Sequence, residues 1–293
     1  MPAGWRNSAL EMIHPVRIAH RGASGEAPEN TIAAFEQAIQ LGVDLVELDV
    51  QLTGDGHLVV IHDATLDRTT DLSGAVAEKT LAEIRKGDAG SWFSARFRGE
   101  RVPLLEEVLE LAKRRVLTLV EIKGRHIAER VIQVIEEMGV EDQVVIQSFV
   151  PQTVRRVKLL APALPAALLV SSLPTTPARI RVRRLAREVL ETGANAVGIW
   201  HTALTPALLE EMRQRSIGVW AWTVDDEIVL RDLALMGVQG LITNYPDRLN
   251  QVLQELEGEG SIHPPLGRRR QRVQSRWGRR RQLKKMRRAA PES

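Results

Sequence analysis

Short apolar runs recur along most of the chain and alternate with longer amphipathic stretches. Most of the runs are rich in Val, Ile and Leu, a composition typical of strands that are buried on both faces. The eight runs occupy residues 16–20, 43–50, 116–122, 144–149, 166–170, 196–199, 218–222 and 240–243. Four stretches between them show the apolar spacing of amphipathic helices, at residues 31–41, 127–138, 206–215 and 225–236.

A strand followed by a helix, repeated along the chain, predicts parallel strands joined by right-handed crossovers. Eight such units within 293 residues predict a closed (β/α)8 TIM barrel. Gly237, directly after the fourth helical stretch, supports this interpretation because glycine commonly ends helices. A doubly wound open sheet is the alternative architecture.

Two segments depart from the alternation. Residues 58–61 predict an extra short strand, and residues 63–102, which are polar and irregular, predict a small insertion after the second barrel strand, packed over the barrel mouth. We expect the last helix to end near Leu256 and residues 258–260 to form a linker. The predicted division is therefore a barrel domain at residues 14–256 and a linker with a basic tail at residues 257–293.

The net charge of +3 conceals a strong segregation of charge. Residues 261–293 contain 12 Lys or Arg and one acidic residue, which leaves 28 basic and 36 acidic residues in the first 260. The tail is expected to be disordered, or to contact an anionic membrane or another polyanion; no specific nucleic-acid recognition is predicted. The absence of cysteine excludes disulfides and thiolate chemistry. With no signal peptide or membrane span visible, we expect a soluble, cytoplasmic protein, peripheral at the membrane if the tail binds it.

Polar side chains with coherent chemistry end the apolar runs, where the active site of a (β/α)8 barrel lies. Glu47 and Asp49 share one face of the second strand, and Glu121 ends the third. Buried carboxylates resist ionisation unless a cation lies between them. The three oxygen ligands therefore predict one divalent cation, Mg²⁺ or Ca²⁺ or else Mn²⁺. An ion pair of Lys123 with Glu47 or Asp49 is the alternative that needs no metal.

Ten short motifs in order resemble the signature of the glycerophosphodiester phosphodiesterase family, and the resemblance spans residues 14–249. They begin with His20-Arg21-Gly22, Pro28-Glu29-Asn30-Thr31, Glu47-Leu48-Asp49-Val50 and His62-Asp63. They continue through Thr65-Leu66-Asp67-Arg68-Thr69-Thr70, Val102-Pro103-Leu104-Leu105-Glu106-Glu107, Glu121-Ile122-Lys123 and Gln147-Ser148-Phe149. They end with Trp222-Thr223-Val224-Asp225 and Ile242-Thr243-Asn244-Tyr245-Pro246-Asp247.

The resemblance implies a role for each matching side chain. It implies His20 and His62 as the acid/base pair and Glu47, Asp49 and Glu121 as the metal ligands. It implies that Arg21 and Lys123 contact the phosphate and that Trp222 and Phe149 contact the organic groups of the substrate. Glu29 would either orient Arg21 or bind the glycerol hydroxyls. Asn30 is interpreted as the N-cap of the following helix, and Trp220 as a core residue.

The implied activity is metal-dependent hydrolysis of glycerophosphodiesters to sn-glycerol 3-phosphate and an alcohol. One alternative is a lysophospholipase D, or another lipid phosphodiesterase on the same scaffold. A second alternative, from another class, is an inactive barrel that binds polyanions or membranes through its tail.

Overall fold

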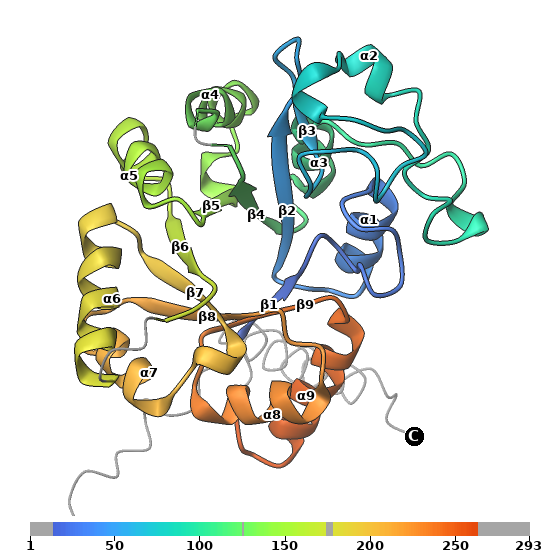
Figure 1. Ribbon diagram of the computed structural model, residues 1–293. Helices are drawn as coiled ribbons and strands as arrows, with labels where there is room; N and C mark the ends of the chain where they lie inside the picture. The colour runs from blue at the N-terminus through green and yellow to red at the C-terminus, as the bar shows by residue number, and fades with distance from the viewer. Residues whose placement is uncertain (1–13, 125, 174–177, 263–293) are drawn as a thin grey trace, which may run out of the picture.

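The computed structural model describes residues 14–124, 126–173 and 178–262 (Figure 1). Eight parallel strands form a closed barrel, because β1 (Val16–Ala19) pairs with both β9 (Gly240–Thr243) and β2 (Leu45–Leu52). The strands between them around the barrel are β4 (Leu117–Ile122), β5 (Val144–Ser148), β6 (Ala166–Val170), β7 (Ala196–Trp200) and β8 (Gly218–Trp222). The predicted (β/α)8 barrel is confirmed, and the open sheet is excluded.

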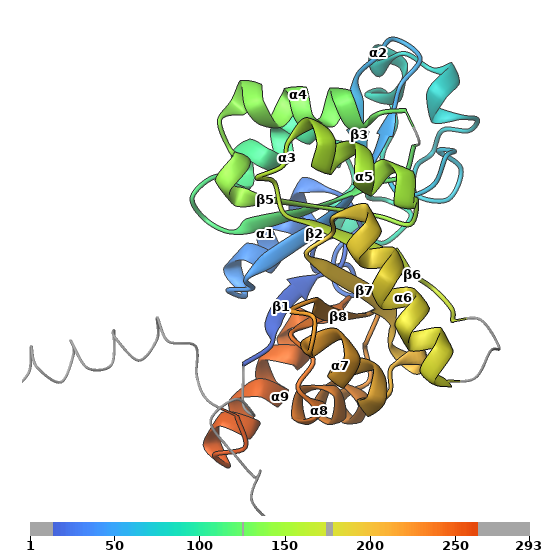
Figure 2. The same ribbon diagram turned by 90° about the vertical axis from the view of Figure 1, so that its left-hand side faces the viewer.

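Helices surround the barrel on its outer side (Figures 1 and 2). They are α1 (Ile32–Gln40), α3 (Leu105–Ala112), α4 (Ala128–Met138), α5 (Pro151–Leu160), α6 (Ala178–Thr192), α7 (Pro206–Arg213), α8 (Glu227–Met236) and α9 (Pro246–Gly258). Capping side chains fix where several of them begin. The hydroxyl of Thr205 accepts from Leu208 N at the start of α7, and the carboxylate of Asp226 accepts from Ile228 N at the start of α8.

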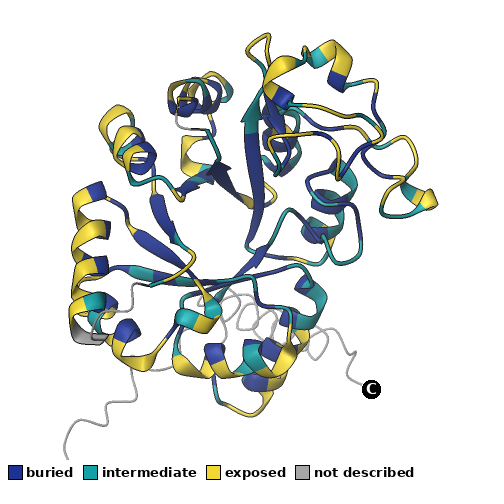
Figure 3. Cartoon of the chain, in the orientation of Figure 1, coloured by how far each residue is buried: buried dark blue, intermediate teal, exposed yellow. Residues whose placement is uncertain are grey.

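The apolar side chains form two layers. The larger layer lies between the strands and the helices, and a smaller one fills the barrel interior around Ile18, Leu119 and Ile242. Figure 3 shows the barrel strands as mostly buried and the surrounding helices as alternately buried and exposed. Trp220 packs against the interior layer, so its assignment to the core is confirmed. Gly240 makes this packing possible, because a Cβ atom there would lie 2.5 Å from the Trp220 ring.

The insertion forms a small lobe with its own apolar cluster. The extra strand, β3 (Leu58–Val60), pairs antiparallel with β2, and the lobe that follows contains α2 (Leu81–Ile84) and two single-turn 3₁₀ helices (Val76–Glu78 and Ala95–Phe97). Its cluster includes Leu66, Val76 and Ile84. The expectation that it packs over the barrel mouth was wrong for most of the lobe, which Figure 1 shows beside the barrel next to β2. Only its first part reaches the edge of the mouth, where Asp63 contacts His62 and Arg68 donates to Glu29.

The end of the barrel domain also differs from the prediction. Helix α9 continues to Gly258 instead of ending near Leu256, so the proposed linker begins inside the helix. Ile262 is buried, and its N–H donates to Leu256 O, which ties the chain back onto α9. The basic segment 263–293 lies outside the described residues. Within the described ranges, no helix is both long and apolar enough to cross a bilayer; the cytoplasmic location stays a prediction.

Candidate active site

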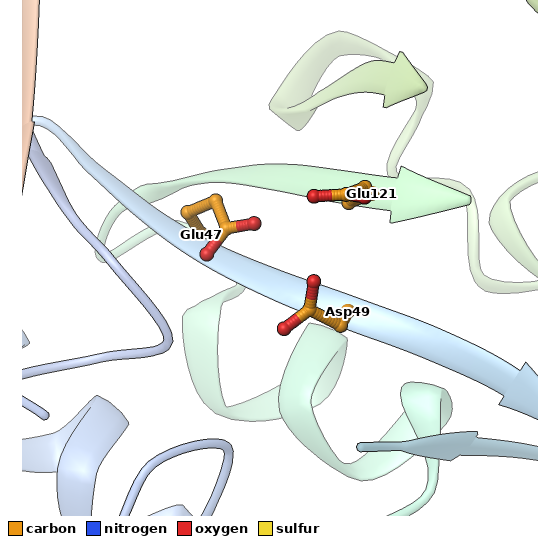
Figure 4. A group of neighbouring side chains, drawn as sticks. All are labelled: Glu47, Asp49 and Glu121. Carbon is orange, nitrogen blue, oxygen red and sulfur yellow. The ribbon is translucent and has the colours of Figure 1, made fainter. Parts of the chain in front are cut away.

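Three buried carboxylates meet at the carboxyl ends of β2 and β4. Asp49 lies opposite Glu121 in the register of the two strands, and Glu47 precedes Asp49 by two residues on the same face. Figure 4 shows the three carboxylates turned toward one another, and one ligand oxygen from each lies within 4.8 Å of the other two. Their residues are at most 6% exposed. The geometric grouping predicted from the sequence is present.

A strained turn after β1 delivers a backbone donor to this cluster. Arg21 has φ 56° and Gly22 has φ 82°, two consecutive left-handed residues. A Cβ atom on Gly22 would lie 2.6 Å from the Ala34 carbonyl carbon of α1, so only glycine fits there. The turn directs Arg21 N toward Glu47, where it donates to Oε2 at 2.9 Å. Unfavourable backbone geometry of this kind is typical of functional sites.

Two cationic side chains contact the carboxylates. Lys123 Nζ lies 3.0 Å from Asp49 Oδ1 and 2.7 Å from Glu121 Oε1, and Arg21 Nε lies 3.1 Å from Asp49 Oδ2. Arg21 also donates to Glu29 Oε1 at 2.9 Å, as one interpretation of Glu29 predicted. Of the two ion pairs considered for Lys123 from the sequence, the one with Asp49 is formed, and Glu121 takes the place of Glu47 as the second partner. Three carboxylates and two cations still leave one excess negative charge.

The unequal distribution of these contacts separates the pKa values of the three acids. Burial, and then the Asp49 and Glu121 charges, raise the pKa of Glu47 well above its usual value. Burial and Asp49 raise the pKa of Glu121 to about 7, against the opposing effect of Lys123. Burial also tends to raise the pKa of Asp49, but the charges of Lys123 and Arg21 outweigh this effect and lower the pKa below its usual range. A metal-free cluster therefore tends to retain a proton.

Because of this proton, the stability of the metal-free protein should depend on pH. The pKa of Glu121 is about 7 in the folded state and near 4.5 when unperturbed. Between these values the folded state binds more protons at Glu121 than the unfolded state does, so the unfolding free energy falls as pH rises. With chelator present, we expect the urea midpoint to decrease from about pH 5 to about pH 8. In Glu121→Gln the urea midpoint should decrease less over the same pH range. A decrease equal to that of the wild type would exclude Glu121 as the cause.

The two histidines have chemically different partners. His20 Nδ1 lies 2.7 Å from the amide oxygen Oδ1 of Asn244, whereas His62 Nδ1 lies 2.6 Å from the carboxylate oxygen Oδ1 of Asp63. Arg68 donates to Asp63 and also to Glu29, which links His62 to the Arg21 side of the site. Burial and then the Arg21 charge lower the pKa of His20 to about 4, and burial also lowers the pKa of His62.

Both histidines, two of the carboxylates and both cations line one cavity of about 190 Å³ at the barrel mouth. Its opposite wall is aromatic: the ring centroid of Trp222 lies 5.3 Å from that of Phe149 and 5.1 Å from that of Trp200, both in edge-to-face geometry. The buried Trp222 Nε1 has no hydrogen-bond partner in the described structure. The cavity therefore has a charged half and an aromatic half.

Two side chains that donate hydrogen bonds to the acidic cluster could not be identified as its partners from the sequence. Asn30 donates to Asp49 Oδ2 at 2.9 Å, and Gln147 donates to Glu47 Oε1 at 3.0 Å. The interpretation of Asn30 as a helix cap was wrong, because Thr31 is the N-cap and its hydroxyl accepts from Ala34 N. Both amides lie within quoted motifs, but amide side chains carry no charge pattern that would mark them as carboxylate partners.

Comparison with known proteins identifies the family. The model of the glycerophosphoryl diester phosphodiesterase family matches residues 20–248. The chain belongs to this family. It is 42% identical to a glycerophosphodiester phosphodiesterase from Caldanaerobacter subterraneus, over 79% of this chain and 95% of that protein. A Bacillus subtilis protein of the same name is 35% identical over 85% of this chain and 90% of its own length.

Solved structures support the family membership. The chain resembles a glycerophosphodiester phosphodiesterase from Agrobacterium tumefaciens with a TM-score of 0.71 and 30% identity, over 81% of this chain and 99% of the other. It resembles an Oleispira antarctica phosphodiesterase, solved in complex with the product sn-glycerol-3-phosphate, with a TM-score of 0.76 and 28% identity, over 82% and 97% of the two chains. The family resemblance of the sequence is thus confirmed.

Proposed function

We propose that this member of the glycerophosphoryl diester phosphodiesterase family hydrolyses glycerophosphodiesters to sn-glycerol 3-phosphate and an alcohol, with a divalent cation and two histidines. One observation carries the proposal. A single cavity brings together both histidines, both cations and two carboxylates of the acidic cluster: His20, His62, Arg21, Lys123, Glu47 and Glu121. An inactive binding module would have no chemical need for this combination of groups.

The acidic cluster fits a hard divalent cation. Glu47, Asp49 and Glu121 supply only oxygen atoms, which suits Mg²⁺, Ca²⁺ or Mn²⁺. The raised pKa values of Glu47 and Glu121 and the excess negative charge both favour a further cation between them. When bound, such an ion would stabilise the negative charge that develops on the phosphoryl oxygens.

The cations on the protein would orient the phosphate. Arg21 and Lys123 line the cavity and lie beside the carboxylates, so they can bind two phosphoryl oxygens next to the metal. Glu29 contacts both Arg21 and Arg68, and we assign it the role of holding the Arg21 guanidinium in place. Cations placed where charge accumulates lower the barrier to phosphoryl transfer.

The partners of the two histidines distinguish their roles. His20 contacts a neutral amide and has a pKa of about 4, so its neutral ring can accept the proton of the attacking hydroxyl. Burial lowers the pKa of His62, but the Asp63 carboxylate opposes this effect and favours the protonated ring, so of the two histidines His62 is the one that we assign as donor to the leaving alkoxide. The attacking oxygen belongs either to water or to the neighbouring glycerol hydroxyl.

The aromatic half of the cavity would receive an organic group of the substrate. Trp222 and Phe149 form an apolar wall beside Lys123, whose Nζ lies 6.0 Å from the Phe149 ring centroid. The unpaired Trp222 Nε1 can donate to a substrate hydroxyl. Phe149 is 41% exposed, and this position at the rim is compatible with longer alcohol groups.

The purified protein tests the proposal directly. We expect Mg²⁺-, Ca²⁺- or Mn²⁺-dependent release of sn-glycerol 3-phosphate and choline from glycerophosphocholine, measured by coupled assay. Faster turnover of lysophosphatidylcholine would favour the lysophospholipase D alternative. No turnover of either substrate with any of the three ions would favour the binding module.

For the basic tail we propose contact with an anionic surface. Each basic residue near an anionic membrane contributes on the order of 1 kcal/mol, and residues 263–293 contain all twelve of the tail's Lys and Arg. Removal of 263–293, which keeps the buried Ile262, should leave kcat for glycerophosphocholine unchanged and reduce co-sedimentation with phosphatidylserine-containing liposomes. Equal co-sedimentation of the truncated and full-length chains would contradict this role.

A further inference from the structure

Three neighbouring strands bring Asp225, Asn244 and His20 into a line of hydrogen bonds. Asp225 follows β8, Asn244 follows β9 and His20 follows β1, and these strands are adjacent in the barrel (Figure 1). Asn244 Nδ2 donates to Asp225 Oδ2 at 2.7 Å, and Asn244 Oδ1 lies 2.7 Å from His20 Nδ1. Asp225 lies outside the cavity lining and does not contact His20 directly, so any effect on His20 passes through Asn244.

The chemistry of these groups fixes the direction of every hydrogen bond. An ionised carboxylate only accepts hydrogen bonds, so Asp225 requires the NH₂ group of Asn244 to face it. The amide oxygen of Asn244 must then face His20, and because this oxygen cannot donate, His20 Nδ1 must carry the hydrogen. A neutral His20 therefore has its lone pair on Nε2.

Further contacts prevent Asn244 from turning over. Asp225 Oδ1 accepts from Asn244 N at 2.8 Å and from Thr243 Oγ1 at 3.0 Å, so both carboxylate oxygens are in use. Ser24 Oγ lies 2.8 Å from Asn244 Oδ1 and 2.7 Å from the backbone oxygen of His20, and because it has a single hydrogen it does not by itself fix the amide. An amide flipped by 180° would place its oxygen against the Asp225 carboxylate, where two acceptors would meet.

We propose that Asp225 is a positioning residue for His20: through the fixed amide of Asn244 it holds the Nδ1–H tautomer, so that the proton of the attacking hydroxyl is taken up at Nε2. The inference rests on the proposed function for its catalytic consequence. The tautomer itself follows from the hydrogen bonds and can be tested without turnover.

An isosteric exchange at the two positions separates this role from a structural one. In Asp225→Asn, the new NH₂ group must face either the backbone N–H of Asn244, where two donors meet, or the Asn244 side chain, whose oxygen then turns away from His20. We expect kcat to fall about 10²-fold, within the range for general acid–base catalysis, with little change in KM. The double variant Asp225→Asn, Asn244→Asp restores an acceptor that faces both neighbours, and kcat should largely recover.

The matched control is Asp226→Asn, the same change on the next residue, which caps α8 through Ile228 N and Val229 N. It should keep kcat within twofold of the wild type. Arg21, Asp49 and Glu29, the charged groups that act on His20, are retained in all these variants, whereas the double variant moves one carboxylate from position 225 to position 244, directly beside His20 Nδ1. A fall in kcat for Asp225→Asn that the second substitution does not reverse would overturn the proposal, and so would a wild-type rate in the single variant.

A spectroscopic measurement tests the tautomer independently of activity. Long-range ¹H–¹⁵N correlation spectra of the labelled full-length chain, with His20 assigned from a His20→Gln sample, should show the Nδ1–H form in the wild type and the Nε2–H form in Asp225→Asn. An Nε2–H wild-type ring would contradict the inference even if the enzyme is active. If glycerophosphodiesters are not hydrolysed at all, the proposed function fails while this measurement still decides the tautomer.

Discussion

Replacement of His20 or His62 by alanine is expected to abolish measurable turnover of glycerophosphocholine while the protein stays folded. A positioned general acid or base contributes about 10²–10⁴-fold to a rate, and choline is a poor leaving group that needs protonation. Neither histidine belongs to the apolar core, so the loss of the ring should cost little stability. Steady-state kinetics and the thermal unfolding midpoint of each variant check both parts of this result.

A substrate with an activated leaving group distinguishes the two histidines. A glycerophosphodiester of p-nitrophenol releases a phenolate that leaves without protonation, so His62→Ala should lose far less activity on it than on glycerophosphocholine. His20→Ala should lose similar activity on both, because the attacking hydroxyl must still give up its proton. The matched control is His57→Ala, which replaces a partly exposed histidine directly before β3 and should retain wild-type rates. Equal losses for the two catalytic variants on both substrates would contradict the assigned roles.

The barrel could be predicted because its strands are buried on both faces. Runs such as residues 166–170 and 218–222 correspond to β6 and β8 with identical bounds, since apolar composition directly reflects burial between the two layers. The carboxylate cluster could be predicted because a two-residue spacing on β2 places Glu47 and Asp49 on one face. Both inferences rest on local periodicity alone.

Other features depend on contacts between distant residues and have no local pattern. The line from Asp225 through Asn244 to His20 joins residues more than 200 positions apart, and only closure of the barrel between β9 and β1 brings them together. The position of the insertion beside the mouth is set by its separate cluster around Leu66 and Ile84, whose partners cannot be assigned from an irregular segment. Lys123 pairs with two acids at once, which no pairwise spacing indicates.

Removal of divalent cations is expected to lower kcat by at least about 10²-fold, and re-addition of Mg²⁺, Ca²⁺ or Mn²⁺ should restore it. The reason lies in the charge of the cluster: three carboxylates against Arg21 and Lys123 leave one negative charge uncompensated, and Glu47 ionises with difficulty. Activity assays of EDTA-treated protein, dialysed to remove the chelator and titrated with each ion, measure the effect.

Stability provides a second measurement of the same binding. An ion that binds the folded state at a concentration 100 times its Kd stabilises by about 2.7 kcal/mol, so the thermal midpoint should rise with added cation. Glu121→Gln should weaken both the midpoint shift and the recovery of activity. Glu210→Gln, a change at an exposed carboxylate on α7, should affect neither.

The alternative to a metal makes the opposite prediction. If Lys123 alone neutralises Asp49 and Glu121, chelation should leave kcat unchanged and cations should not move the thermal midpoint. Lys123→Met separates the two cases further. In a metal site it should mainly weaken phosphate binding and raise KM. In a cluster held by the ion pair it should leave two acids without a cation, and the folded protein should lose stability as pH rises. Full activity after chelation would therefore assign the charge compensation to the protein's own cations.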